Sequence, residues 1–240
     1  MILRTMFISM MVLGIVGTGV ITASEGGSIT ASGSMDYYSK YMWRGYTLDV
    51  DPVLQPGFSL TGYGITASVW GSMPVANRDG VLSNEVDLTI GYSFQGDGFT
   101  ISLGHISYQF PVITPTMTNE VYIGMGLTKL PVGVALTYYN DYSDSDGIKG
   151  SYIGMDISKE LALTPYPVTT ALHYGVFNEY GVIASGSDLS VSVKTTLPAT
   201  SALGISPLIG YVVPGGDLSD STIGAQGNAL YGGISIGYSF

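Results

Sequence analysis

Hydrophobic and polar residues alternate with a period of two along most of the chain after residue 24. In the last segment, Leu230, Ile234 and Tyr238 share one parity, and Ser235 and Ser239 share the other. Residues two apart point to the same face of a β-strand. The segment therefore predicts a strand with one apolar face and one face of small or polar residues.

Twelve segments show this pattern, so the sequence predicts an all-β protein. Each segment is about 9–16 residues long, whereas strands of soluble proteins average about 5–6 residues. A tilted transmembrane strand needs about 9–11 residues, so the lengths favour a membrane protein. The predicted strands are 29–44, 53–61, 64–72, 84–94, 98–110, 118–128, 131–142, 149–160, 167–177, 187–196, 203–213 and 228–240.

The predicted connections tend to alternate between short and long. Residues 62–63, 95–97 and 129–130 are short, and 73–83 and 214–227 are long. Bacterial outer-membrane barrels have an even number of strands, short periplasmic turns and longer outer loops. The order predicts a single antiparallel transmembrane β-barrel of about 12 strands with both termini in the periplasm. A soluble all-β fold, with the large apolar residues inside, stays open as an alternative.

The N-terminus has the features of a secretory signal peptide. Arg4 precedes an apolar stretch over residues 6–21, and Thr22, Ala23 and Ser24 supply small residues for cleavage. The alternative is a membrane anchor, but the apolar stretch is slightly short for one. We expect a signal peptide over residues 1–24 and a transmembrane β-barrel domain over residues 25–240.

Composition excludes several classes of function. Eight Lys and Arg residues against 18 Asp and Glu residues give a net charge of −10, which disfavours nucleic acid as a partner. The absence of Cys excludes disulfides and thiolate sites. We expect no cofactor and no metal centre. Residues 140–147 superficially resemble a calcium loop, but the flanks and distal Glu of an EF-hand are missing; a solvated loop is the simpler interpretation.

Two local expectations follow from the parity of large side chains. The strand over residues 98–110 changes phase between Leu103 and Ile106, and a β-bulge at Gly104 and His105 would repair it. With that bulge, the large residues stay on the lipid face. The aromatic residues expected there, as an interface belt, are Tyr41, Trp43, Tyr92, Phe94, Tyr108, Phe110, Tyr211, Tyr238 and Phe240.

Several motifs resemble one protein family. Residues 36–45 read DYYSKYMWRG, residues 53–56 read VLQP, residues 84–92 read NEVDLTIGY, residues 104–111 read GHISYQFP and residues 119–122 read NEVY. In this order they resemble the TorF-type outer-membrane porin family of Gram-negative bacteria, although Lys40 stands where an acidic residue is common. The resemblance implies a pore-like barrel in the bacterial cell outer membrane and names no solute.

The chain ends in an alternating strand with a terminal aromatic residue. Tyr238, Ser239 and Phe240 resemble the sorting signal that the barrel assembly machinery reads, so Tyr238 and Phe240 are the predicted assembly signal. Other expected partners are outer-membrane lipid and lipopolysaccharide, and small hydrophilic solutes or ions.

The candidate functional residues are the charged side chains within the predicted strands. A charge on the lipid face costs about 2–4 kcal/mol at the bilayer midplane, so these side chains should face the lumen, together with both histidines. They could pair and fill a narrow barrel, or line a conduit and set its ion preference. The predicted pore-lining residues are Asp36, Lys40, Arg44, Glu85, Asp87, Glu120, Asp156, His173 and Lys194.

The function expected from the sequence is passive diffusion. We expect a porin-like outer-membrane channel for small hydrophilic solutes or ions, with a mild cation preference because acidic residues crowd the predicted outer mouth. We expect no enzymatic activity and no catalytic residues. The alternatives are an outer-membrane hydrolase of the lipase or lipid deacylase type, and a structural or adhesive barrel with a plugged lumen.

Overall fold

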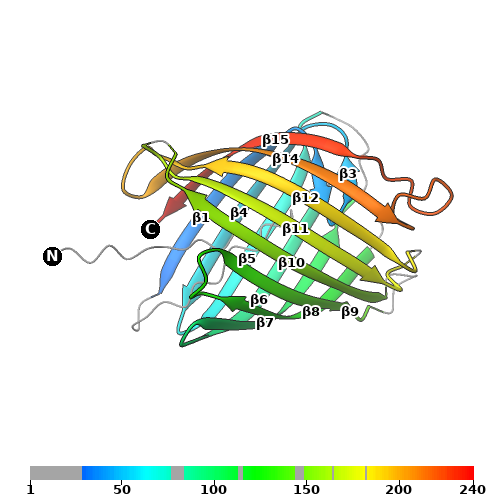
Figure 1. Ribbon diagram of the computed structural model, residues 1–240, viewed down its shortest axis with the longest axis horizontal. Helices are drawn as coiled ribbons and strands as arrows, with labels where there is room; N and C mark the ends of the chain where they lie inside the picture. Colours follow the sequence, from blue (N-terminus) through cyan, green and yellow to red (C-terminus); the bar gives the residue numbers. More distant parts are fainter. Residues whose placement is uncertain (1–28, 77–83, 113–115, 144–148, 164, 182) are drawn as a thin grey trace.

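Twelve long strands build the wall of a closed barrel (Figure 1). The computed structural model describes residues 29–76, 84–112, 116–143, 149–163, 165–181 and 183–240. The expected signal peptide and residues 144–147 of the expected solvated loop over residues 140–147 therefore lie outside the described residues. The wall strands are β1 (Thr30–Tyr38), β4 (Val53–Gly62), β5 (Ile65–Pro74), β6 (Glu85–Gly96), β7 (Phe99–Phe110), β8 (Thr116–Leu127), β9 (Gly133–Asp141), β10 (Gly150–Leu161), β11 (Val168–Asn178), β12 (Gly186–Thr195), β14 (Leu203–Gly216) and β15 (Ala229–Ser239).

Antiparallel pairing of neighbours runs around the whole ring. β1 pairs with both β4 and β15, and β14 pairs with both β12 and β15, so no wall strand has a free edge. The two-residue β13 (Leu197–Pro198) adds only to β14. The predicted all-β barrel of 12 antiparallel strands is confirmed. Among the described residues, no helix is long and apolar enough to cross a membrane.

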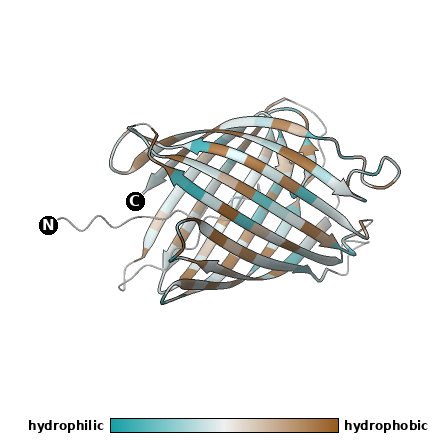
Figure 2. Ribbon diagram, viewed as in Figure 1, coloured by the Kyte–Doolittle hydropathy of each residue, from teal (hydrophilic) through white to brown (hydrophobic). Residues whose placement is uncertain are grey.

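The outside of the barrel is the apolar side. Leu88 and Ile90 on β6 are 47% and 58% exposed, whereas Asp87 on the same strand is 1% exposed. Hydrophobic residues alternate in this way along the wall strands (Figure 2). The alternative of a soluble fold with the large apolar residues inside is therefore wrong.

The barrel has two different rims. The start of β1 and the end of β15 lie at one end of the barrel, which we call the terminal rim, and the opposite end is the loop rim (Figure 1). At the terminal rim, Tyr63–Gly64 and Asp97–Gly98 join neighbouring strands by short turns. Residues 39–52 and 217–228 are among the longer connections at the loop rim. This arrangement matches the predicted order of short turns and long loops.

The first predicted strand is too long. Residues 29–44 do not form one strand: β1 ends at Tyr38, and β2 (Tyr41–Trp43) and β3 (Tyr46–Asp49) form a separate hairpin. Arg44 and Gly45 connect β2 to β3 with φ angles of 44° and 81°. Two residues with positive φ fit the twist of a tight hairpin, but a non-glycine residue such as Arg44 adopts this conformation at a cost.

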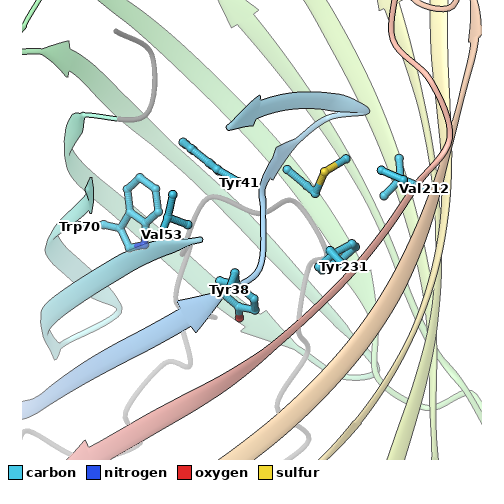
Figure 3. Packing of buried hydrophobic residues seen from close by; sticks show 8 residues of the cluster. Tyr38, Tyr41, Val53, Trp70, Val212 and Tyr231 are labelled. Carbon is cyan, nitrogen blue, oxygen red and sulfur yellow. The ribbon is translucent and has the colours of Figure 1, made fainter. Parts of the chain in front are cut away.

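The β2–β3 hairpin lies inside the barrel (Figure 3). Tyr41 and Met42 are buried and pack in one cluster with Val53, Trp70 and Val212 of the wall. A second cluster joins the hairpin to the loops and consists of Tyr152, Phe177, Tyr180, Ile183 and Leu218, with Trp43 and Tyr46 packed against it. The hairpin and these loop residues therefore occupy the lumen on the side of the loop rim.

The predicted bulge at Gly104 and His105 is wrong. β7 pairs without interruption with β6 from Val86 to Gly96 and with β8 from Thr116 to Leu127. Gly104 is instead required by packing: a Cβ atom there would lie 2.5 Å from the Tyr122 hydroxyl and 2.7 Å from the carbonyl oxygen of Ile90. Without a bulge, Ile106 and Tyr108 turn inward and are buried.

Candidate functional site

A buried ion pair joins the hairpin to the barrel wall. Arg44 Nη1 and Nη2 donate to Glu120 Oε1 and Oε2 on β8 at 2.6 and 2.9 Å, and the Tyr108 hydroxyl donates to Glu120 Oε2 at 2.7 Å. The two charged side chains are 5% and 0% exposed. A two-pronged guanidinium–carboxylate contact fixes both distance and orientation, so it locks the tip of the hairpin in the lumen.

Aromatic rings surround the same guanidinium group. Arg44 Cζ lies 4.8, 4.2 and 4.5 Å from the ring centroids of Trp43, Tyr139 and Tyr152. Each ring face attracts the cation, and the attraction is stronger in a desolvated position. The strained turn at Arg44 is thus held by one carboxylate and three rings, which explains why it persists.

A second polar network lies on β10, β11 and β12. His173 Nδ1 is 2.8 Å from Asp156 Oδ1, and His173 Nε2 is 2.5 Å from the Tyr152 hydroxyl, which donates to Asp188 Oδ1 at 2.8 Å. Tyr152 has one proton and uses it on Asp188, so its oxygen accepts from Nε2. His173 thus lies between the carboxylate of Asp156, which it contacts directly, and that of Asp188, which it reaches through Tyr152.

Two further carboxylates lie on β6 below the hairpin. Glu85 and Asp87 are 4% and 1% exposed. The Tyr41 hydroxyl donates to Glu85 Oε2 at 2.5 Å, whereas neither carboxylate oxygen of Asp87 receives a hydrogen bond from a described residue. This unpartnered buried carboxylate is a feature that packing alone does not explain.

The structure brings six of the nine predicted pore-lining residues together in pairs. Arg44 contacts Glu120, and His173 contacts Asp156. Asp36 on β1 and Lys194 on β12 are half-buried and interact electrostatically. Lys40 is half-buried in the segment that leads from β1 into the hairpin.

Sequence reasoning placed several residues on the wrong face. Tyr41 and Tyr108 are buried inside, and Trp43 and Phe110 pack against the lumenal clusters, so these four are not part of an outer aromatic belt. His105, expected in the lumen, shares the outward parity of Leu103, and its Nε2 lies 2.8 Å from the hydroxyl of the exposed Tyr142.

Two buried carboxylates were missed. Asp141, expected in an outer loop, is the last residue of β9, is buried and accepts from the backbone N–H of Ser143 at 2.9 Å. Asp188 could have been found, because it alternates with Ser190, Ser192 and Lys194 on the polar parity of its strand. Within the described part of the chain, no group of three or more His, Cys, Asp and Glu residues could hold a metal ion.

Comparison with known families gives one match. Residues 22–206 match the family model described as "Bacterial protein of unknown function (Gcw_chp)". The chain belongs to this family. The family description does not contain the TorF-type name, which stays a prediction. A comparison with curated proteins found no match.

Solved structures with a similar fold are outer-membrane porins and channels. The KdgM porin in complex with disordered oligogalacturonate has a TM-score of 0.56 at 14% identity, and covers 88% of this chain and 99% of its own. The COG4313 outer membrane channel from Pseudomonas putida F1 has a TM-score of 0.54 at 9% identity, with 94% and 100% covered. The NanC porin has a TM-score of 0.50 at 13% identity, with 89% and 99% covered. These likenesses show a porin-like barrel fold.

Proposed function

We propose that the protein is an outer-membrane channel for passive diffusion of small hydrophilic solutes or ions, with a mild preference for cations. The observation that carries the proposal is the closed barrel whose outside is apolar and whose inside holds a polar network with an excess of carboxylates. Apolar residues around a closed ring of strands suit a lipid bilayer. The similar folds of porins and channels support the same assignment.

The cation preference rests on the buried charges. Among the described residues, the buried acids are Glu85, Asp87, Glu120, Asp141, Asp156 and Asp188, and the buried basic residues are Arg44 and His173. Asp36 and Lys194 offset each other nearby. An excess of negative charge inside a low-dielectric wall concentrates cations and repels anions. Salt screens this effect, so the preference should be strongest at low ionic strength.

The β2–β3 hairpin is the proposed constriction. It fills the lumen towards the loop rim, where the three hydrophobic clusters converge on Trp43. Towards the terminal rim, inward positions carry small side chains such as Ser32, Ser59, Thr66, Ser93 and Ser192. A solute would thus meet one narrow zone, lined by the hairpin and the carboxylates.

Planar-bilayer recording of the refolded protein tests the proposal. We expect single-channel steps and a zero-current potential in a KCl gradient that indicates cation preference. The double variant E85Q/D87N should shift this potential towards anion preference. D97N, which removes one exposed charge from a turn at the terminal rim, is the control and should leave it nearly unchanged. Wild-type preference for anions, or an unchanged potential in the double variant, would refute the role of the carboxylates.

A barrel with a plugged lumen is the second candidate. The specific observation in its favour is the packed hairpin, since Tyr41, Met42, Ile183 and Leu218 are 0–1% exposed. This candidate predicts that bilayers with correctly folded protein stay silent at every voltage. The hydrolase alternative has less support, because the ring nitrogens of His173 contact Asp156 and Tyr152 and not a serine.

A further inference from the structure

The Asp87 carboxylate is flanked by aromatic rings. Asp87 is directly opposite Trp70 of β5 and Tyr108 of β7 in the strand register. All three side chains face inward and are at most 5% exposed. Directly opposed side chains on one face have their Cβ atoms about 4.5–5.5 Å apart, so an indole and a phenol ring border the carboxylate on its two sides.

Described basic residues do not neutralise this position. Both terminal nitrogens of the Arg44 guanidinium group donate to Glu120, and Lys194 interacts with Asp36. The groups that act on Asp87 are Glu85, whose carboxyl group is close enough to share a proton with that of Asp87, and Glu120; both are acidic. An unpaired buried carboxylate costs several kcal/mol, so Asp87 requires either a proton or a bound cation.

The hairpin closes this position from the lumen. The Tyr41 hydroxyl donates to Glu85, and the Tyr41 ring lies 5.8 Å from the Trp70 ring (Figure 3). A neutral hydroxyl is a weaker donor to a carboxylate than an ammonium or guanidinium group. A cation that enters can therefore displace Tyr41 and gain the two carboxylates together with the ring faces.

We propose that Glu85, Asp87, Trp70 and Tyr108 form a subsite for the ammonium or guanidinium group of a small organic solute, with Tyr41 as its displaceable cover. The proposal rests on the proposed channel function and names the class of solute. A single organic cation suits the site, since its flat or tetrahedral N–H groups bond the carboxylates while its carbon atoms lie against the rings. The acids and rings belong to three neighbouring wall strands, so the subsite is part of the rigid barrel.

Block of the potassium current by methylguanidinium tests the subsite. Methylurea has nearly the same shape without the charge and is the matched probe. Wild-type current should be blocked by millimolar methylguanidinium and not by methylurea. Asp87→Asn should raise the half-blocking concentration by about tenfold or more, since a hydrogen bond to a charged group is lost. Tyr41→Phe, which removes the competing hydroxyl, should lower it. Asp97→Asn is the control and should not change it.

Calorimetric titration of methylguanidinium into the detergent-refolded protein separates the subsite from conduction. Binding that is lost in Asp87→Asn supports the subsite even if bilayers stay silent, in which case only the channel function fails. Equal block of wild type and Asp87→Asn, equal block by methylurea, or absence of binding to the wild type at pH 7 overturns the subsite. The last result is expected if Glu85 and Asp87 share a proton. Unheated gel mobility confirms that each variant is folded.

Discussion

Glu120→Gln should release the hairpin from the lumen without unfolding the barrel. The substitution keeps the size of the side chain and removes the only carboxylate in contact with Arg44 among the described residues. It leaves a guanidinium group that is 5% exposed and has lost its two-pronged partner. Arg44 belongs to the hairpin and not to the wall, so the least costly response is movement of the hairpin into water.

The size of the effect follows from the burial of the pair. Breaking a buried ion pair by removing one partner costs about 3–5 kcal/mol, and each 1.4 kcal/mol is about a tenfold change in an equilibrium constant. The ratio of open to closed hairpin should therefore rise by about two to four orders of magnitude. The guanidinium group is still attracted by the rings of Trp43, Tyr139 and Tyr152. The expected change in the ratio of open to closed hairpin is therefore at the lower end of this range.

Single-channel conductance measures this change, and urea unfolding monitored by tryptophan fluorescence controls for the wall. Glu120→Gln should give larger or longer openings, with an unfolding midpoint close to that of the wild type. The double variant R44M/E120Q removes both charges and should restore most of the closed state. Conductance identical to that of the wild type, or a coupling energy below about 0.5 kcal/mol in the double-mutant cycle, would refute the role of the pair as a latch.

Three further changes test the fold and its assembly. Phe240→Asp should lower the yield in the outer-membrane fraction, whereas Phe240→Tyr should keep it; equal yields would contradict the sorting role of the exposed terminal ring. Gly104→Ala should lower the free energy of unfolding by about 1–3 kcal/mol through overpacking against Tyr122. The control Gly237→Ala has no atom within 4 Å of its new Cβ and should leave the free energy of unfolding unchanged. Similar urea midpoints for the two variants would show that Tyr122 can move. Tyr152→Phe removes the hydroxyl that donates to Asp188 and should lower the free energy of unfolding by about 1–3 kcal/mol in the same urea assay. The control is the outward-facing Tyr138→Phe. Equal losses in the two variants would show that the network does not stabilise the fold.

The wall strands could be predicted from the sequence because the alternating pattern that defines each strand lies within one short segment. Alternation of side chains along one strand fixes which residues face outward, and the long strands are untypical of a soluble sheet. The predicted strand over residues 84–94 corresponds to Glu85–Gly96, and that over residues 203–213 to Leu203–Gly216. The inward position of Glu85, Asp87, Glu120, Asp156 and His173 follows from the same parity.

The hairpin could not be predicted from alternation. β2 and β3 have the same period of two as the wall, so the pattern of residues 29–44 continues past the end of β1. The turn itself is an Arg-Gly pair, a weaker signal than the Asn-Gly or Asp-Gly pairs that favour such turns. Which segment folds into the lumen depends on partners far away in the sequence, such as Glu120, 76 positions after Arg44.

The lumenal tyrosines show why parity assigned some rings to the wrong face. A tyrosine can bury its ring and still hydrogen-bond through its hydroxyl, so it suits the lumen as well as the lipid interface. Tyr108 packs with Ile106 and Trp43 inside, while its hydroxyl binds Glu120. The phase change in β7 is therefore not a bulge but a transition from small inward residues near the terminal rim to large ones beside the hairpin.

At several positions of the wall a glycine lies opposite a tyrosine, and this arrangement affects the width of the lumen. Tyr122 is opposite Gly104, Tyr231 is opposite Gly210 and Tyr38 is opposite Gly233 in the strand register. At each of these glycines an added Cβ atom would collide with the tyrosine ring, so the ring lies across the wall in the space that a side chain would fill. Rings held flat in this way leave the centre of the barrel to the hairpin and direct hydroxyl groups along the inner surface. In these three pairs, glycine makes room on the wall and tyrosine lines it with a polar edge. A larger residue at such a glycine should push a ring towards the hairpin and narrow the lumen, even though the strand pairing of the barrel is unchanged.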